Sequence, residues 1–113
     1  MAAASGVTLE IDGGKVPLFD GVIDLARQNR SGGMTSNQEY FAAGVSAPDH
    51  LDERAEDLLS LLYDPQTSGG LLISAAADWS DQVAAALERA GVRAVRIGRA
   101  HSQSGGVRVR IVV

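Results

Sequence analysis

The sequence predicts one α/β domain, with a central mixed sheet of about four strands flanked by about three helices. Apolar residues alternate with polar ones at residues 7–11 and again at 107–113, which is typical of half-buried strands. At residues 52–63 and 80–90 they recur instead every three or four positions, as on one face of a helix. Because strands and helices interleave along the chain, we expect a sheet covered by helices.

The first strand is expected at residues 7–11, before a tight turn at Gly13 and Gly14. A first helix is expected from Pro17 to Gln28, since proline suits a first helical turn and apolar residues follow at helical spacing. Residues 29–48 contain few periodic apolar residues, so they predict a long ordered loop with room for one short turn of helix.

The second helix is expected at residues 52–63, with Asp49 or Asp52 as its N-cap. An Asp-Pro pair ends it, because the residue before proline is pushed out of the helical conformation. The nearly unbroken apolar run Leu71–Ala75 predicts a strand in the interior of the sheet, covered on both faces.

A third helix is expected at residues 80–90, with Gly91 in position for a left-handed C-cap. Two last strands, at 93–97 and 107–113, are expected to pair as a hairpin. The strand at 71–75, the third helix and the strand at 93–97 also fit a right-handed crossover unit.

Composition excludes several classes of protein and of chemistry. The 113 residues contain no cysteine, so disulfides, thiolate ligands and a thiol nucleophile are excluded. No apolar run approaches the roughly 20 residues that a membrane helix needs, and the first residues do not resemble a secretory signal. We therefore expect a cytoplasmic protein with no membrane partner.

Charge is segregated along the chain. Residues 1–88 contain 4 basic and 14 acidic side chains, whereas residues 89–113 contain 6 arginines and no acid. No aromatic residue follows Trp79, so the arginines lack partners for stacking on RNA bases, and no nucleic-acid partner is expected. We expect these arginines to protect sheet edges or to pair with the acidic part of the chain.

Residues 64–70 read Asp-Pro-Gln-Thr-Ser-Gly-Gly and lie between an expected helix and an expected strand. Two hydroxyls and unhindered backbone N–H groups are the ingredients of an anion-binding nest, in which Asp64 could orient the loop or a magnesium-bound water. The alternative is turn chemistry alone, in which Asp64 and Thr67 satisfy backbone groups at the helix end and the glycines supply the turn.

A second polar cluster precedes the second helix. Arg30 could clamp a phosphate through its planar guanidinium, and nearby glycines would permit close approach; a solvated surface loop is the alternative. The acidic residues at 49–57 are expected to form the solvated face of a helix rather than a metal site, and His50 and His101 stand alone, so no catalytic residue and no metal ligand is predicted. The cluster comprises Asn29, Arg30, Gly32, Gly33, Thr35 and Asn37.

Residues Leu61–Ile73 closely resemble a signature of the selenophosphate synthetases, in which a leucine-rich helix runs into Asp-Pro-Gln-Thr-Ser-Gly-Gly and then an apolar strand. The resemblance extends from about Gly6 to Arg99. It implies the α/β fold of the C-terminal domain in the superfamily of aminoimidazole ribonucleotide synthetase. The flanking matches are Lys15–Leu18, Gly32, Gly33, Asn37, Tyr40, Ala90–Val92, Ile97 and Gly98.

The resemblance also implies a function. Members of this family are two-domain enzymes that use ATP, magnesium and selenide to make selenophosphate, AMP and phosphate. The nucleophilic cysteine or selenocysteine, the essential lysine and most metal-binding aspartates belong to an N-terminal domain that is not present here. We therefore expect residues 1–113 to be a single truncated domain that is inactive alone and supports the nucleotide site.

Eight residues are candidate contacts to the nucleotide or to a phosphate under this resemblance. The alternative function is a stand-alone, non-enzymatic module for anion binding or oligomerisation. Since a sheet that lacks neighbouring strands exposes an edge, the expected partners are a second copy of the chain and the missing N-terminal domain. The candidates are Asp64, Gln66, Thr67, Ser68, Gly69, Gly70, Arg30 and Asn37.

Overall fold

A computed structural model describes residues 1–66, 68–103 and 105–113 of the chain. Its sheet has four strands in the order β2-β4-β1-β3. β1 pairs in parallel with β4 and antiparallel with β3, and β2 pairs in parallel with β4. The predicted α/β class with a mixed sheet is therefore confirmed. The strands are β1 (Val7–Asp12), β2 (Val45–Ser46), β3 (Gly98–Ser102) and β4 (Val109–Val112).

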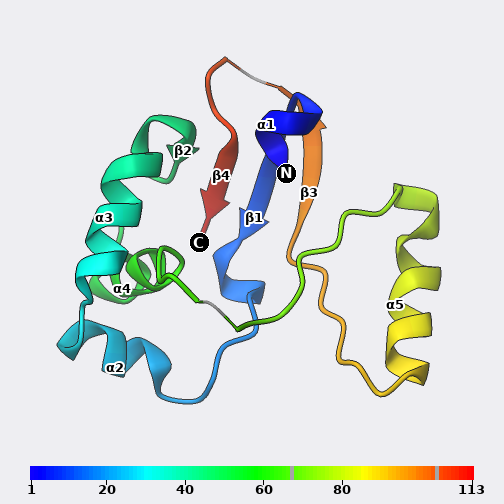
Figure 1. Cartoon of the computed structure of the whole chain (residues 1–113), viewed down its shortest axis with the longest axis horizontal. Helices are drawn as coiled ribbons and strands as arrows, with labels where there is room; N and C mark the ends of the chain where they lie inside the picture. Colours follow the sequence, from blue (N-terminus) through cyan, green and yellow to red (C-terminus); the bar gives the residue numbers. More distant parts are fainter. Residues whose placement is uncertain (67, 104) are drawn as a thin grey trace.

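Three helices gather on the β2 side of the sheet, and a fourth, α5, lies on the opposite side, apart from the others (Figure 1). No described helix is long and apolar enough to cross a membrane. The α-helices are α1 (Ala2–Ser5), α2 (Val22–Gln28), α3 (Gly32–Phe41), α4 (Glu53–Leu61) and α5 (Ser80–Arg89), and the short 3-10 turns are η1 (Gly13–Lys15), η2 (Ala42–Gly44) and η3 (Ala77–Trp79).

Strand register explains the alternating pattern in the sequence. Leu9 lies beside Val109 and Ile11 beside Ile111, so these apolar side chains share one face of the sheet. Glu10 is on the other face, beside Arg110 on β4 and Arg99 on β3. Its carboxylate lies 3.6 Å from the Arg110 guanidinium and 3.6 Å from His101 Nε2. The expected pairing between the acidic and basic parts of the chain therefore occurs across β1.

The two last strands do not form a hairpin, so that prediction is wrong. β1 lies between them and uses both of its edges: Leu9 N donates to Arg108 O at 2.9 Å on one side, and Asp12 N to Ile97 O at 2.7 Å on the other. The paired register of β1 with β3 ends at Gly98, opposite Ile11, and one further hydrogen bond reaches Ile97, so residues 93–96 of the predicted strand lie beyond the pairing.

The apolar run Leu71–Ala75 forms no strand, which contradicts the predicted interior strand and the crossover unit. Leu71 is 89% exposed, and Leu72 and Ile73 are about half exposed. An apolar run indicates that burial would stabilise a segment, but a strand also needs a neighbouring strand to pair with. None of the described strands pairs with this segment. The predicted helix after it forms as α5, with Gly91 at φ 76°, yet none of its residues is buried.

The predicted loop at 29–48 is also wrong, because α3 occupies ten of its residues. Ser31 caps this helix by accepting a hydrogen bond from Met34 N at 3.2 Å. Met34 is the buried residue of α3, and such a mostly solvated helix shows little apolar periodicity in its sequence. The predicted helix from Pro17 begins only at Val22, because Gly21 adopts φ 76° just before it.

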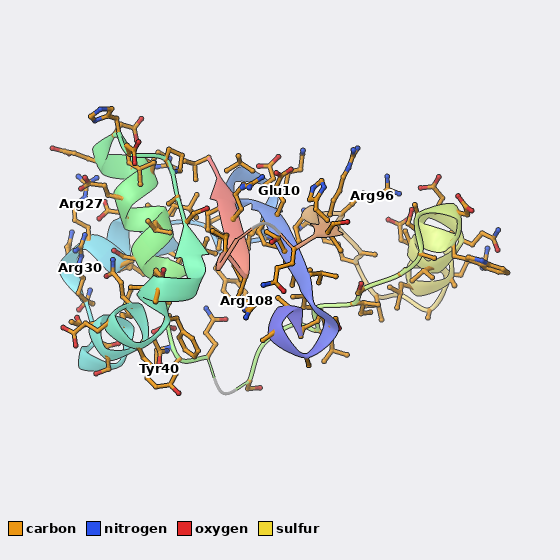
Figure 2. The ribbon with its side chains drawn as sticks, turned by 90° about the horizontal axis from the view of Figure 1, so that it is seen from above. Glu10, Arg27, Arg30, Tyr40, Arg96 and Arg108 are labelled. Carbon is orange, nitrogen blue, oxygen red and sulfur yellow. The ribbon has the colours of Figure 1, made fainter. Side chains whose placement is uncertain are left out.

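Helix α4 is confirmed, and it organises the helical layer. Asp52 is its N-cap and accepts from Ala55 N at 2.8 Å. Leu58 and Leu61 are buried on it, together with the charged residue Asp57. Asp57 accepts from Arg27 Nε of α2 at 2.6 Å and lies 3.4 Å from the Arg30 guanidinium (Figure 2 labels both arginines). The hydrogen bond from Arg27 holds the pKa of Asp57 below its ordinary value, against the opposing effect of burial.

Substituting Asp57 with asparagine should lower stability most above pH 4. Because the pKa of Asp57 is lower in the folded chain than its ordinary value of 3.8, the stabilisation is fully present above that value. It is lost as the pH falls through the folded pKa. D57N should therefore unfold at lower urea concentration than the wild type at pH 7, with a shallower loss toward pH 3. Part of the dependence of stability on pH should remain in D57N, because Lys15 also lowers the pKa of Asp12.

Asp81→Asn is the matched control for this urea titration. Asp81 also pairs with an arginine, Arg96, but its side chain is 92% exposed, and exposed pairs contribute little to stability. Equal destabilisation by D57N and D81N would contradict the role given to the buried carboxylate.

Gly98→Ala should separate β3 from β1. An added Cβ would lie 1.9 Å from the carbonyl oxygen of Glu10, which is backbone and cannot rotate away. Overpacking of this kind costs about 1 to 3 kcal/mol. Gly106→Ala is the control, because nothing lies within 4 Å of an added Cβ there. Urea denaturation measures both, and a neutral G98A would show that the β1–β3 pairing is not as described.

Candidate functional site

The residues after α4 form a tight turn that begins the candidate loop. Asp64 N donates to Leu61 O at 3.0 Å, which closes the helix end, and Gln66 N donates to Asp64 O at 2.8 Å across Pro65. The predicted end of the helix at the Asp-Pro pair is confirmed. Residues 64–70 are called the signature loop below; Thr67, one of the predicted contacts, lies outside the described residues.

The structure brings part of the second predicted cluster against this loop. Asn37 of α3 donates from Nδ2 to the carbonyl oxygen of Tyr63 at 2.9 Å. Gly33, one turn earlier on α3, faces Pro65 so closely that an added Cβ would lie 2.7 Å from Pro65 Cγ. The sequence placed both residues in a polar loop, and nothing in their spacing indicated that they meet the end of α4.

Arg30 is placed elsewhere. It lies beside Arg27 at the outer side of the helical layer, and its guanidinium is 3.4 Å from Asp57 (Figure 2). An arginine held by a buried carboxylate is engaged in the packing of α2 on α4. A phosphate clamp by Arg30 therefore stays a prediction that the contacts of the described residues do not support.

Ser68, Gly69 and Gly70 are exposed, and the fold itself does not require the two glycines. Neither glycine has a positive φ. Nothing lies within 4 Å of a Cβ added at Gly70, and at Gly69 the nearest atom is Gln66 Oε1 at 3.3 Å, the end of a flexible side chain. A left-handed turn is thus not the reason for glycine at these positions, which weakens the alternative of turn chemistry alone.

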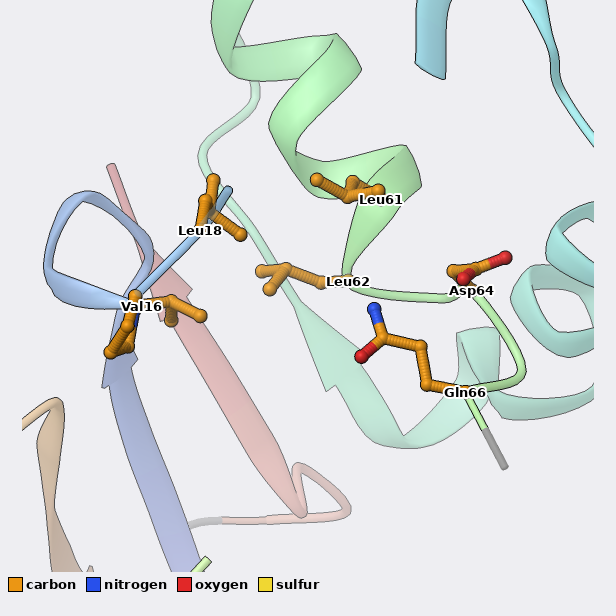
Figure 3. Close-up of a pocket in the computed structure, with 7 residues that line it drawn as sticks. Val16, Leu18, Leu61, Leu62, Asp64 and Gln66 are labelled. Carbon is orange, nitrogen blue, oxygen red and sulfur yellow. The ribbon is translucent and has the colours of Figure 1, made fainter. Parts of the chain in front are cut away.

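A hollow of about 260 Å³ lies beside the loop (Figure 3). The Gln66 side chain extends toward it, whereas the Asp64 carboxylate points away from Leu62 and Val16. Five of the seven lining residues are apolar, and Asp64 and Gln66 supply the polar side chains. The sequence did not indicate that the segment before α2 would contribute to it. The lining residues are Val16, Pro17, Leu18, Leu61, Leu62, Asp64 and Gln66.

The described part of the chain holds no ready-made cluster of metal ligands. Mg²⁺ is held by carboxylates together with substrate phosphates and waters, and the described residues contain no group of three histidines, cysteines or carboxylates that could hold a metal ion. The arrangement can instead offer the backbone N–H groups of Ser68–Gly70 to an anion on the open side of the loop.

The chain is similar over almost its whole length to a known family of domains. The family described as AIR synthase related protein, C-terminal domain, matches residues 1–110. Selenide, water dikinase of Clostridioides difficile is 37% identical over 84 residues, which make up 74% of this chain and 23% of that protein. Selenide, water dikinase of Geobacter metallireducens is 37% identical over 99 residues, or 87% of this chain and 28% of that protein.

The chain spans about a quarter of the length of these relatives. The resemblance of the chain to the selenophosphate synthetases is confirmed, because relatives named selenide, water dikinase match 74% and 87% of this chain. Three findings agree: the four-stranded mixed sheet with its helices, the family match to residues 1–110, and the similarity to selenide, water dikinases. The chain belongs to the family of AIR synthase related C-terminal domains and is related to that part of selenide, water dikinases.

Proposed function

We propose that this chain is the C-terminal part of a selenide, water dikinase, an enzyme that makes selenophosphate from selenide, ATP and water. In this proposal the signature loop contacts a phosphate group of ATP through its backbone. Two findings support it: the chain is related to proteins named selenide, water dikinase, and the signature loop occupies an exposed position after α4.

The observation that carries the proposal is the pair of glycines at 69 and 70. Their backbone conformation and surroundings would admit a side chain, as shown above. Glycine is also selected where a ligand must approach the backbone closely, because any Cβ would hold the ligand away from the N–H groups. An anion on the open side of the loop accounts for both glycines.

The chain supplies binding rather than the reacting groups. It has no cysteine, and its single lysine, Lys15, lies 2.6 Å from the carboxylate of Asp12. In this proposal the nucleophile and the magnesium ligands belong to another domain of the whole enzyme. We propose that the chain alone forms no selenophosphate and supports the nucleotide site of the whole enzyme.

A second function, a stand-alone anion-binding or oligomerisation module, has two observations in its favour. Leu71, Leu72 and Ile73 follow the loop and expose much of their apolar surface, and β3 is an edge strand of the described sheet. Exposed apolar segments and open edges favour association with another chain. In this alternative the loop would bind phosphate and ATP equally well.

Replacing Gly70 with valine should weaken the binding of ATP with magnesium by about tenfold, equal to 1.4 kcal/mol. A Cβ added at Gly70 meets nothing within 4 Å, so a loss of affinity reports on the approach of the ligand. Gly106→Val, at another open glycine, is the matched control. Isothermal titration calorimetry measures all three proteins, with inorganic phosphate as a second titrant.

The proposal predicts that ATP binds more tightly than phosphate and that G106V binds as the wild type does. Equal affinity for the two titrants would favour the stand-alone anion module. Unchanged ATP affinity in G70V, or no binding by the folded wild-type chain, would contradict a nucleotide contact by this loop.

A further inference from the structure

We propose that Asn37 is a positioning residue for the signature loop: it holds the start of the loop through the backbone of Tyr63 and does not itself touch the nucleotide. This inference rests on the proposed function, because positioning has a purpose only if the loop binds a ligand. It reassigns Asn37, which the sequence predicted as a direct contact.

One N–H group of the Asn37 side-chain amide is already in use. Its Nδ2 donates to Tyr63 O at 2.9 Å, across 26 residues of sequence and in partly buried surroundings. Tyr63 follows the last turn of α4, where carbonyl groups have no partner within the helix. Asn37 therefore satisfies a carbonyl one residue before Asp64 and fixes the point from which the loop departs.

A second contact lies on the same face of α3. Gly33 and Asn37 are four residues apart, a spacing that places both on one side of a helix. Gly33 packs against Pro65, with only 2.7 Å between an added Cβ and Pro65 Cγ. The loop is thus fixed at both ends of its Asp64 turn, at Tyr63 by a hydrogen bond and at Pro65 by close packing.

Helix α3 is a firm support for these two contacts. Met34, between them, is buried, and Ser31 caps the helix start. Ser68–Gly70 are exposed and follow this turn closely in sequence, so the turn limits where they can lie. A loop held in one conformation loses less freedom on binding, which raises affinity without adding a contact.

Two substitutions test the inference, each with a matched control. Asn37→Asp keeps the shape but replaces the donor by a carboxylate that faces a carbonyl oxygen. Asn29→Asp is its control, because Asn29 Nδ2 makes the same kind of bond, to Leu25 O at 2.9 Å. Gly33→Ala pushes on Pro65, whereas Gly32→Ala, next to it on α3, meets nothing within 4 Å.

Amide hydrogen exchange of the ligand-free chain, followed by NMR, is the first readout. N37D and G33A should speed exchange at Asp64 and Gln66, whose N–H groups donate to Leu61 O and Asp64 O, by about fivefold, the effect of losing one hydrogen bond. Exchange in α4 and β1 should stay as in the wild type. Titration with ATP and magnesium is the second readout, and the same variants should bind about fivefold more weakly, while N29D and G32A should match the wild type.

The outcomes separate the inference from the proposed function. Unchanged loop exchange in N37D overturns positioning, and weaker ATP binding without faster exchange would show that Asn37 touches the nucleotide directly. Faster exchange with unchanged affinity also overturns it, since the contact would then serve the fold alone. If the wild type binds no ATP but exchange in the loop is still faster in N37D and G33A, the proposed nucleotide contact is wrong. The structural role of Asn37 and Gly33 in holding the loop is then still supported.

Discussion

The buried carboxylate of Asp57 is the constraint on which the helical layer depends. It is the one charged side chain among the buried residues described, and its partners are Arg27 at the end of α2 and Arg30, two residues beyond that helix. A buried charge is tolerated only with partners and hydrogen bonds, so Arg27 and Arg30 must stay against α4. This pairing fixes α2 on α4, beside the buried residues Leu58 and Leu61.

From α4 the constraint extends to the sheet and to the signature loop. Leu58 approaches Gly13 at the end of β1, where an added Cβ would lie 3.3 Å from Leu58 Cδ2. At its other end α4 leads directly into Tyr63 and the Asp64 turn, which α3 supports. The candidate site is therefore not an isolated motif: its position follows from the packing of three helices.

The sequence correctly predicted those features of the fold that depend on residues close together in the chain. The alternation at β1, the cap by Asp52 and the Asp-Pro end of α4 were all readable, since each depends on residues close in sequence. Other features depend on distant partners. Leu71–Ala75 has the composition of a strand but no neighbouring strand, and β3 begins at Gly98 because that is where β1 ends its pairing. Helix α3 was missed because only Met34 on it is buried.

The same division applies to the candidate site. The signature loop was recognisable from seven consecutive residues, but the contacts that support it were not. Asn37 donates to a backbone carbonyl, and the sequence pattern of side chains does not indicate such a partner. Glycine is needed at position 33 because Pro65 lies against it. Arg30 looked like an anion ligand because its partner, Asp57, lies 27 residues away on another helix.

Amide hydrogen exchange across the whole chain tests the central claim most directly, namely that the sheet and α2 to α4 form one packed body to which residues 71–97 add no strand. At low protein concentration, the account predicts slow exchange at Leu9, Ile11 and Leu61 and nearly unprotected amides at Leu71–Ile73. Protection at Leu71–Ile73 equal to that of β1 would contradict it, because the apolar run would then be a paired strand in solution.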